Sequence, residues 1–479
     1  MDFVVVGQIL KIYVQVLGEP LTNKQRSRAS GYLSHIQNFY FQAAGPRETS
    51  LWPMLAASLD ISATASLLPN LRSLVLDLGN SSPGIGSWLH MMTPLFSLSL
   101  QRITYSATSR HVGGVESFQT LLKSQSNVEL VHVKYQGYPS PNILQRFFLF
   151  QGLESLSLDF FFEGQAIQRY TQSTVAIADI FDQFPRLRDL KIDLRLFPLR
   201  DSSLPDKHVK VAASPVLCKL HVTGDANDLQ AFLVDGVTSS SLLSLTLSLA
   251  QVNGLVWKVL CDQAAANFPN VNSLILQLAQ PNTSVPQLLL QDISSFISRS
   301  TMRLFYIDTI PHCFADNNIA GLVNSWPRLR ALSILNNFGI HFSATVLTEL
   351  CQLPYLEEVA LPLNLSDLET HLPLMTPLTN CPLKSLRVTG YSVAPTTLDG
   401  KIDLARNILM LFPAIQEISS TSTNPSQQVY LGELHKLIQA FHSTIAIQAH
   451  RAALRRQKFG GDPRVRKTAI KRDIGIQWG

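Results

Sequence analysis

The sequence predicts an α/β solenoid, in which strand–helix repeats stack in a right-handed array and their strands form one parallel sheet. An apolar step recurs along almost the whole chain, with apolar residues at its first, fourth and sixth positions, as in Leu187–Ile192. A stretch with apolar residues at helical spacing precedes most of these steps. Several repeats place a proline between the helical stretch and the step: Pro69, Pro185, Pro269, Pro327, Pro354 and Pro413.

The step occurs fourteen times in phase, which chance does not supply. Successive steps are 24 to 35 residues apart, and the mean of about 29 lies at the long end of the range for leucine-rich repeats. We therefore predict a leucine-rich-repeat horseshoe of about fourteen irregular repeats, with a concave parallel sheet and outer helices. The units start at Ile36, Leu71, Leu95, Val128, Leu153, Leu187, Leu217, Leu242, Val271, Met302, Leu329, Leu356, Leu383 and Ile415.

Each repeat is expected to hold one strand over the step and one helix after it. Proline cannot continue a helix and biases the residue before it toward extended backbone, so the helices should end just before the prolines. A right-handed crossover between parallel strands then puts all helices on one face of the sheet. The clearest predicted helices cover residues 173–184, 256–268, 287–298, 344–353 and 401–412.

Three regions are predicted along the chain. Residues 1–30 are expected to form a helical cap, with an apolar stripe over 3–17, because the ends of a repeat array must be covered, or else to be the remnant of a further module. Residues 31–447 form the solenoid, which closes with a capping helix around 431–441. Residues 448–479 are a basic tail that we expect to be disordered. The longer insertions follow strands and should gather on one rim, at 79–94, 105–114, 196–215, 363–377 and 389–401.

The amino-acid composition excludes some classes of protein. Hydrophobic residues make up 46% of the 479 residues and charged residues 15%, which excludes a disordered chain. The formal net charge of +5 comes from the end of the chain, where nine Lys or Arg and two Asp follow residue 449, so the rest carries −2. The folded part is therefore not a basic nucleic-acid surface, and a nucleic-acid partner is expected only through the basic tail. The tail would attract nucleic acid, another acidic partner or a nuclear-import receptor, or else it is a solvated end without a function.

The cysteines and the hydropathy pattern favour the cytoplasm or the nucleus. Five cysteines are scattered without a C-x-x-C pair, which favours reduced thiols over a disulfide framework or a zinc site. The longest apolar runs fall short of the 18 residues that a membrane-spanning helix needs. We expect no membrane partner.

Reactive motifs are not found, and we predict a non-enzymatic protein with no catalytic, cofactor-binding or metal-binding residues. The glycine-bearing loop Gly79–Gly86 follows a strand but offers no lysine to a phosphate. His132 and His221 both occupy outward strand positions, but several repeats separate them, which is too far for a shared metal ion. An enzyme with a site in the rim loops, for example at Asp206 and His208, is the alternative.

Outward strand positions are the better candidates for function. Side chains alternate along a strand, so the residues between and after the apolar positions of each step face away from the core. Their mixture of polar, small and occasional aromatic groups suits a protein or peptide partner on the concave face or the rim loops. The alternative is that most of them are simply solvated strand residues. The candidate partner-binding residues are His132, Lys134, Lys191, Asp193, His221, Tyr306, Asp308 and Arg387.

The repeats resemble the leucine-rich-repeat region of F-box proteins, above all the large sets found in mushroom-forming fungi. The proline-led strand entry after each helix carries this resemblance, together with Glu19–Thr22, Arg28–Ile36 and Leu67–Leu74, which are similar to the segment that follows the F-box. It spans residues 19–447. Proteins of that family are substrate-recognition subunits of cullin-type ubiquitin ligases, in which the F-box holds the ligase adaptor and the repeats hold the target.

The sequence departs from that pattern at its start. An F-box is a helical module that opens with a Leu-Pro signature, and only eighteen residues precede Glu19, none of which form such a module. Either the chain is a truncated form of an F-box substrate receptor, or it is a standalone repeat scaffold or inhibitor without a ligase link. An adaptor is therefore an expected partner only if an F-box exists upstream.

Overall fold

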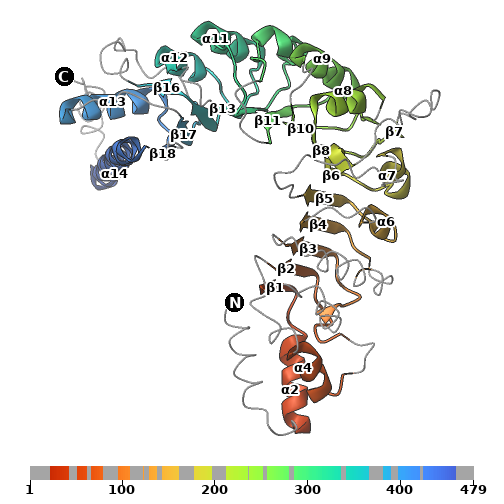
Figure 1. Ribbon diagram of the computed structural model, residues 1–479. Helices are drawn as coiled ribbons and strands as arrows, with labels where there is room; N and C mark the ends of the chain where they lie inside the picture. The colour runs from red at the N-terminus through yellow and green to blue at the C-terminus, as the bar shows by residue number, and fades with distance from the viewer. Residues whose placement is uncertain are drawn as a thin grey trace. The chain divides into compact units, whose positions relative to one another are not determined.

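The computed structural model divides into two compact units, Met1–Phe296 and Ile297–Gly479, which are described separately. In each unit parallel strands lie side by side, and helices cover one face of the sheet (Figure 1). The structure describes residues 22–42, 51–61, 66–78, 95–107, 122, 129–137, 143–160, 177–196, 212–235, 237–251, 256–279, 285–335, 341–365, 381–389, 397–420 and 424–459. The predicted stripe over 3–17 and most of each predicted rim loop lie outside these residues.

In the first unit the strands of the main sheet follow one another in chain order, and every pair for which the register is known is parallel. A short pair, β7 and β9, forms a small separate sheet. The main strands are β1 (Asn38–Gln42), β2 (Ser73–Asp77), β3 (Arg102–Ser106), β4 (His132–Gly137), β5 (Ser155–Phe160), β6 (Asp189–Asp193), β8 (Lys219–Gly224), β10 (Ser244–Leu249) and β11 (Ser273–Leu278). The other elements are α2 (Asn23–Leu33), α4 (Leu51–Ser58), α6 (Ile143–Phe147), α7 (Ile177–Gln183), η2 (Leu194–Leu196), β7 (Ala212–Ala213), α8 (Ala226–Asp235), β9 (Val237–Thr238), α9 (Trp257–Asn267), η3 (Leu290–Ile293) and α10 (Ser294–Ile297), which crosses into the second unit.

The second unit repeats this plan with parallel strands again in chain order. Its main strands are β12 (Leu304–Asp308), β13 (Ala331–Leu335), β15 (Glu358–Leu361), β17 (Ser385–Val388) and β18 (Glu417–Ser420). A short parallel pair, β14 (Phe342–Ser343) and β16 (Leu363–Asn364), lies apart from them. Its helices are α11 (Asp316–Ser325), α12 (Thr345–Leu350), α13 (Leu398–Leu411) and α14 (Pro425–Phe459).

The predicted leucine-rich-repeat solenoid is confirmed, and each of the fourteen predicted units has its own strand in the described residues. Two units start later than predicted. The third begins at Leu100 rather than Leu95, and Leu98, expected in the core, is 77% exposed. The fourth takes Leu130 instead of Val128 as its first core residue. In both strands a buried tyrosine fills the last apolar position, and the rings of Tyr105 and Tyr135 stack with centroids 5.3 Å apart.

The step residues form the core because neighbouring repeats cover them. In the repeat that contains β6, for example, Leu187, Leu190 and Ile192 are all buried, and equivalent residues lie in the repeats to either side. Backbone hydrogen bonds between neighbouring repeats fix their spacing at the start of each strand. The carbonyl of Arg188 accepts hydrogen bonds from the N–H groups of Cys218 and Lys219, at 2.8 and 2.9 Å, and the same pattern recurs between later repeats.

Several helices end on an aromatic residue that stands directly before the predicted proline. Phe268, Trp326 and Phe412 each follow the last helical residue with φ between −132° and −120° and ψ between 66° and 76°, outside the helical region that a following proline disfavours. Each side chain is fully buried, so the residue that stops the helix also fills the space between helix and sheet. Trp326 lies against Phe305 of β12, with ring centroids 5.0 Å apart.

Helix α14 is longer than the predicted capping helix. Its first part covers the end of the second unit through Tyr430, Leu431, Leu434 and Ile438, which are buried. The helix then continues to Phe459, so the predicted start of a disordered tail at residue 448 is wrong for residues 448–459. Residues 460–479 lie outside the described part of the chain. No helix within the described ranges is long and apolar enough to cross a membrane.

His312, between β12 and α11, is a fully buried histidine. Its Nδ1 accepts a hydrogen bond from the backbone N–H of Phe314 at 3.3 Å, and its ring stacks on Phe342 with centroids 6.1 Å apart. Its Nε2 has no hydrogen-bond partner among the described residues. Burial lowers the pKa of His312 to about 4, so the ring is neutral at pH 7.

Replacing a helix-ending aromatic residue should destabilise the unit that contains it. We expect Phe268→Ala to lower the free energy of unfolding by about 3–5 kcal/mol, because it opens a cavity in a fully buried site. Urea unfolding of the two proteins measures this. The control is Leu243→Ala in the same unit, at a residue that is 46% exposed, and a loss there as large as in Phe268→Ala would contradict the assignment.

Stability should fall in acid because of His312. The pKa of His312 is lower in the folded chain than the ordinary value of 6.5, so the unfolded chain binds the proton first. The contribution of the neutral ring is complete above pH 6.5 and is lost as the pH falls, by up to about 1.4 kcal/mol per pH unit. Urea unfolding should be measured for the wild type and His312→Phe between pH 7.5 and 5. As the pH decreases, the free energy of unfolding should fall more for the wild type than for the variant. A constant difference between them would rule this out.

Candidate binding surface

The register of the first unit places several predicted residues in one row across the sheet. Lys134 on β4 stands opposite Ser157 on β5, which stands opposite Lys191 on β6, and Lys191 stands opposite His221 on β8. Neighbouring strands are about 4.8 Å apart, so long side chains in this row are within reach of one another. We call His132, Lys134, Asp159, Lys191 and His221 the charged strip. They project from the face of the sheet opposite the core.

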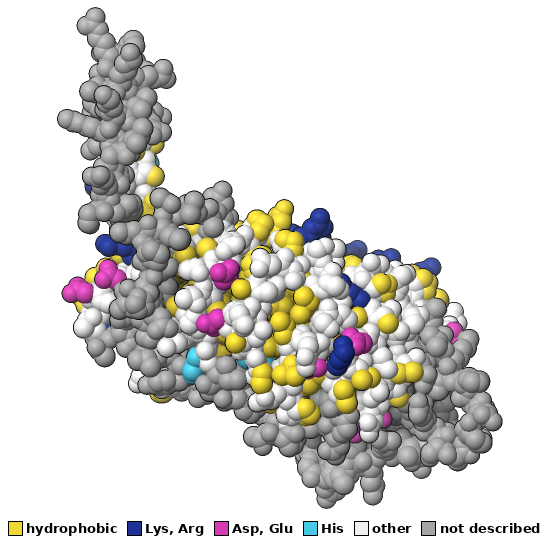
Figure 2. Space-filling model, turned by 90° about the horizontal axis from the view of Figure 1, so that it is seen from above, with side chains coloured by type: hydrophobic (Ala, Val, Ile, Leu, Met, Phe, Trp, Pro, Cys, Tyr) yellow, Lys and Arg dark blue, Asp and Glu magenta, His cyan; other side chains and the backbone are white. Residues whose placement is uncertain are grey.

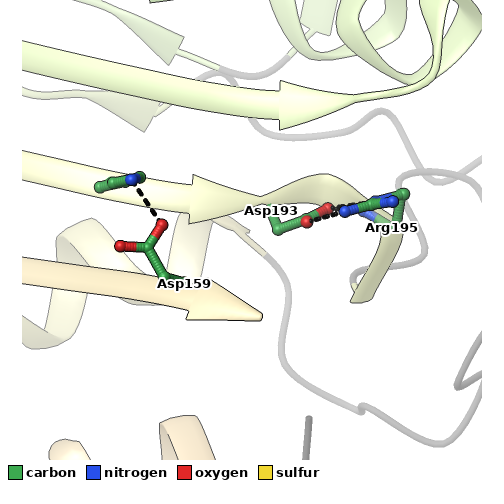
Figure 3. Close-up of polar contacts among 4 residues, drawn as sticks. Asp159, Asp193 and Arg195 are labelled. Carbon is green, nitrogen blue, oxygen red and sulfur yellow. Dashed lines mark hydrogen bonds and ion pairs between the residues drawn. The ribbon is translucent and has the colours of Figure 1, made fainter. Parts of the chain in front are cut away.

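The centre of the charged strip is an ion pair between neighbouring strands. Lys191 Nζ lies 2.5 Å from Asp159 Oδ1, and both side chains are partly shielded from solvent. Figure 3 shows Asp159 pointing toward this amine. Beside the pair, the pKa of His221 is lowered to about 4, first by burial and then by the charge of Lys191, against the opposing charge of Asp159. At neutral pH His221 therefore offers one hydrogen-bond donor and one acceptor rather than a charge.

Two small residues, both serines, lie on β5 between the larger side chains of β4 and β6. Strand β5 carries Ser155 and Ser157. They lie between His132 and Lys134 on β4 and Asp189 and Lys191 on β6.

Two titratable residues beside these serines have shifted pKa values. Burial and then the charge of Arg102 lower the pKa of His132, while the charges of Glu154 and Asp189 act in the opposite direction. The pKa of Asp189 is raised by its own burial, against Lys219 and His132.

Asp193 does not behave as the outward residue that the pattern predicts. Its side chain is buried, with 4% of the residue exposed, and the Arg195 guanidinium binds both carboxylate oxygens, at 2.9 Å from Nε and 2.5 Å from Nη2. The backbone N–H of Arg195 donates to the same carboxylate at 3.1 Å. Figure 3 shows Arg195 closing on Asp193 at the end of β6. The pair stabilises the turn into η2, and Asp193 is not available to a partner in this arrangement.

The second unit brings two other predicted residues together around a residue that the sequence pattern missed. Glu358 on β15 and Arg387 on β17 both lie close enough to Tyr306 on β12 to shift the pKa of its hydroxyl. The pKa of Tyr306 is raised first by burial and then by the charge of Glu358, while Arg387 opposes the shift. Ser333 and Ala360 lie in the row between Tyr306 and Arg387, and both are small and buried.

Asp308 stands apart from this group, two residues further along β12. Burial raises the pKa of its carboxyl group. The next residue, Thr309, has a φ of +59°, an unusual value for a β-branched residue. The Thr309 hydroxyl donates to the Asp308 carbonyl at 2.7 Å.

Residues that the prediction did not select complete the surface. Asp159 and Arg195 form the ion pairs described above, and Glu358 lies near Tyr306. Only the register between strands shows which of the many outward charges meet. Several small outward residues are buried between larger neighbours in adjacent strands, against the expectation of solvent exposure. These are Thr246, Ser248, Ser333 and Thr389.

Within the described ranges, no group of three or more His, Cys, Asp or Glu side chains could hold a metal ion. None of the cysteines in that part of the chain forms a disulfide bond. The surface can offer ammonium and guanidinium groups, carboxylates, hydroxyls and neutral imidazoles to a bound molecule.

No protein-family model matches the chain, and no curated protein sequence matches it. Among solved structures it is similar to an internalin of Listeria monocytogenes, with 11% identity and a TM-score of 0.32 over 74% of this chain and 88% of that chain. It is also similar to the leucine-rich repeat-containing protein LegL7 of Legionella pneumophila, with 13% identity and a TM-score of 0.34 over 84% and 98%. A complex of TLR13 with ssRNA13 gives 15% identity and a TM-score of 0.32 over 74% and 50%. These values carry no argument about function, and the assignment of a leucine-rich-repeat fold rests on the strand order and register of this chain.

Proposed function

We propose that this protein is a non-enzymatic leucine-rich-repeat scaffold that binds a protein partner over the charged strip of its first unit. The observation that supports this most strongly is the concentration of charged and imidazole side chains on β4, β5, β6 and β8, in register and on the face without helices. None of these groups is needed for the apolar core. A face of this kind is free to be used for recognition.

The mixture of groups favours a protein over a nucleic acid. Lys134 and Lys191 are cationic, Asp159 is anionic and His221 is neutral, so the charged strip offers both signs of charge and both kinds of hydrogen-bonding group. Nucleic-acid surfaces carry a continuous stripe of Lys and Arg. On the side that Figure 2 shows, the described surface also carries small groups of both charges among uncharged side chains. A partner with its own mixed charges fits such a surface best.

Tyr306, Glu358 and Arg387 form a second contact region on the sheet of the second unit. An aromatic ring and an exposed guanidinium are the side chains most enriched where binding energy concentrates in protein interfaces. Ser333 and Ala360 are small, so the surface between Tyr306 and Arg387 has room for a side chain of the partner. Asp308 lies on the same strand and extends this region.

The charged strip should lose its partner when its cations are reversed. We expect Lys134→Glu with Lys191→Glu to weaken binding at least about tenfold, because an attractive charge pair becomes a repulsive one at each position. The wild type is used to recover and identify the bound protein by mass spectrometry, and binding of that purified protein is then measured by calorimetry for wild type and variant.

Lys258→Glu is the matched control, since Lys258 lies on α9 of the same unit and is exposed. If this control loses as much affinity as the double variant, or the double variant binds like wild type, the charged strip is not the interface.

The resemblance to F-box proteins suggests a setting in a cullin-type ubiquitin ligase, with the repeats holding the target. Under this proposal the chain should recover the ligase adaptor and a cullin when it is purified from its native cells. The charged-strip variant should still recover both, because the adaptor would bind elsewhere. Recovery of a target protein without adaptor or cullin would favour the other proposal, a standalone scaffold or inhibitor.

A further inference from the structure

Helix α14 continues well past the part that caps the second unit. His442 on this helix still reaches the residues before β18, and its Nε2 lies 2.7 Å from the carbonyl oxygen of Ile415. None of residues 439–454 is buried, whereas Tyr430, Leu431, Leu434 and Ile438 are. Most helical stability in proteins comes from packing against other surfaces, so a surface that covers this segment would stabilise it.

The charge of this helical extension is of one sign. The last acidic residue in α14 is Glu433, which pairs with Lys401 at 2.6 Å. From there to Phe459 every charged residue in the sequence is a Lys or Arg, namely Lys436, Arg451, Arg455, Arg456 and Lys458. Two such helices from two copies of the chain would repel each other. The charge therefore favours an acidic partner and disfavours self-association.

Large aliphatic side chains are exposed on two sides of the same segment. Ile447 and Leu454 are seven residues apart, about two turns, and lie on one side of the helix. Ile445 is about 200° away from Ile447 around the helix axis. All three are at least half exposed, at 52% for Ile445, 53% for Ile447 and 50% for Leu454.

This arrangement distinguishes between classes of acidic partner. The phosphates of a nucleic acid offer no apolar surface to Ile447 and Leu454. A bilayer surface would cover one side of the helix and leave the other side in water. A protein that encloses the helix in apolar grooves with an acidic rim would cover both sides and match the charge, as in the recognition of basic amphipathic helices by calmodulin-type proteins.

We infer that residues 439–459 of α14 are a docking helix for an acidic, helix-enclosing protein of the calcium-sensor type. This interaction would be separate from partner binding at the charged strip, and it does not depend on the function proposed above.

The test uses the full chain and fluorescently labelled calmodulin, an acidic protein that exposes methionine-rich grooves when it holds calcium. Fluorescence anisotropy should show saturable binding in calcium that is lost when EGTA is added. We expect Ile447→Glu with Leu454→Glu to weaken binding at least about tenfold. Glutamate is a good helix former, so the helix should be retained, which circular dichroism checks.

Val234→Glu is the matched control, because Val234 lies in α8 and is 48% exposed. It should bind calmodulin like wild type, and so should the variant with both charged-strip lysines reversed. No binding in calcium would overturn the inference, as would equal binding by the Ile447 and Leu454 variant. Binding to vesicles of phosphatidylcholine and phosphatidylserine without binding to calmodulin would also overturn it and would identify a membrane surface as the partner.

Discussion

Burial of the apolar step between neighbouring repeats is the constraint on which the rest of the structure depends. A single strand–helix repeat exposes one side of its step, and only the next repeat covers it. Leu187, Leu190 and Ile192 are buried because β5 and β8 carry equivalent residues on either side of them. The backbone bonds from Cys218 and Lys219 to the Arg188 carbonyl hold that spacing. In several repeats an aromatic residue such as Phe268 then fills the gap between the sheet and the helix.

This constraint also determines which residues are free to bind. Because the steps use every second strand position for the core, the alternate positions form rows across the sheet at the strand spacing. Long side chains in these rows, such as Lys191, meet partners on the neighbouring strand, and short ones, such as Thr246 and Ser248, become buried between their neighbours. The shape of the surface therefore follows from side-chain size, and its charge from a few long residues.

The sequence pattern predicts the fold well because the step depends only on local spacing. It misplaces the third unit because Leu95, Leu98 and Leu100 match the step by coincidence, while the last apolar position of the true step is Tyr105, a residue that the pattern does not favour. The site is less predictable. That Asp193 turns back to Arg195, and that Tyr306 meets Glu358, depends on the conformation after the strand and on the register between strands, neither of which spacing alone contains. The length of α14 was missed because its periodicity weakens after Ile438 while its helix-forming alanines continue.

Stability and recognition are separable in this architecture, and the charged strip shows why. An outward residue such as Lys134 makes no contribution to the apolar step, so replacing it should leave the free energy of unfolding nearly unchanged. Asp193 and Arg195 differ, because removing one partner of a buried ion pair leaves an uncompensated charge. A loss of partner binding in a Lys134 variant can therefore be assigned to the interface, because folding should be unaffected. The same loss in an Asp193 variant would be ambiguous, because binding and structure would be lost together.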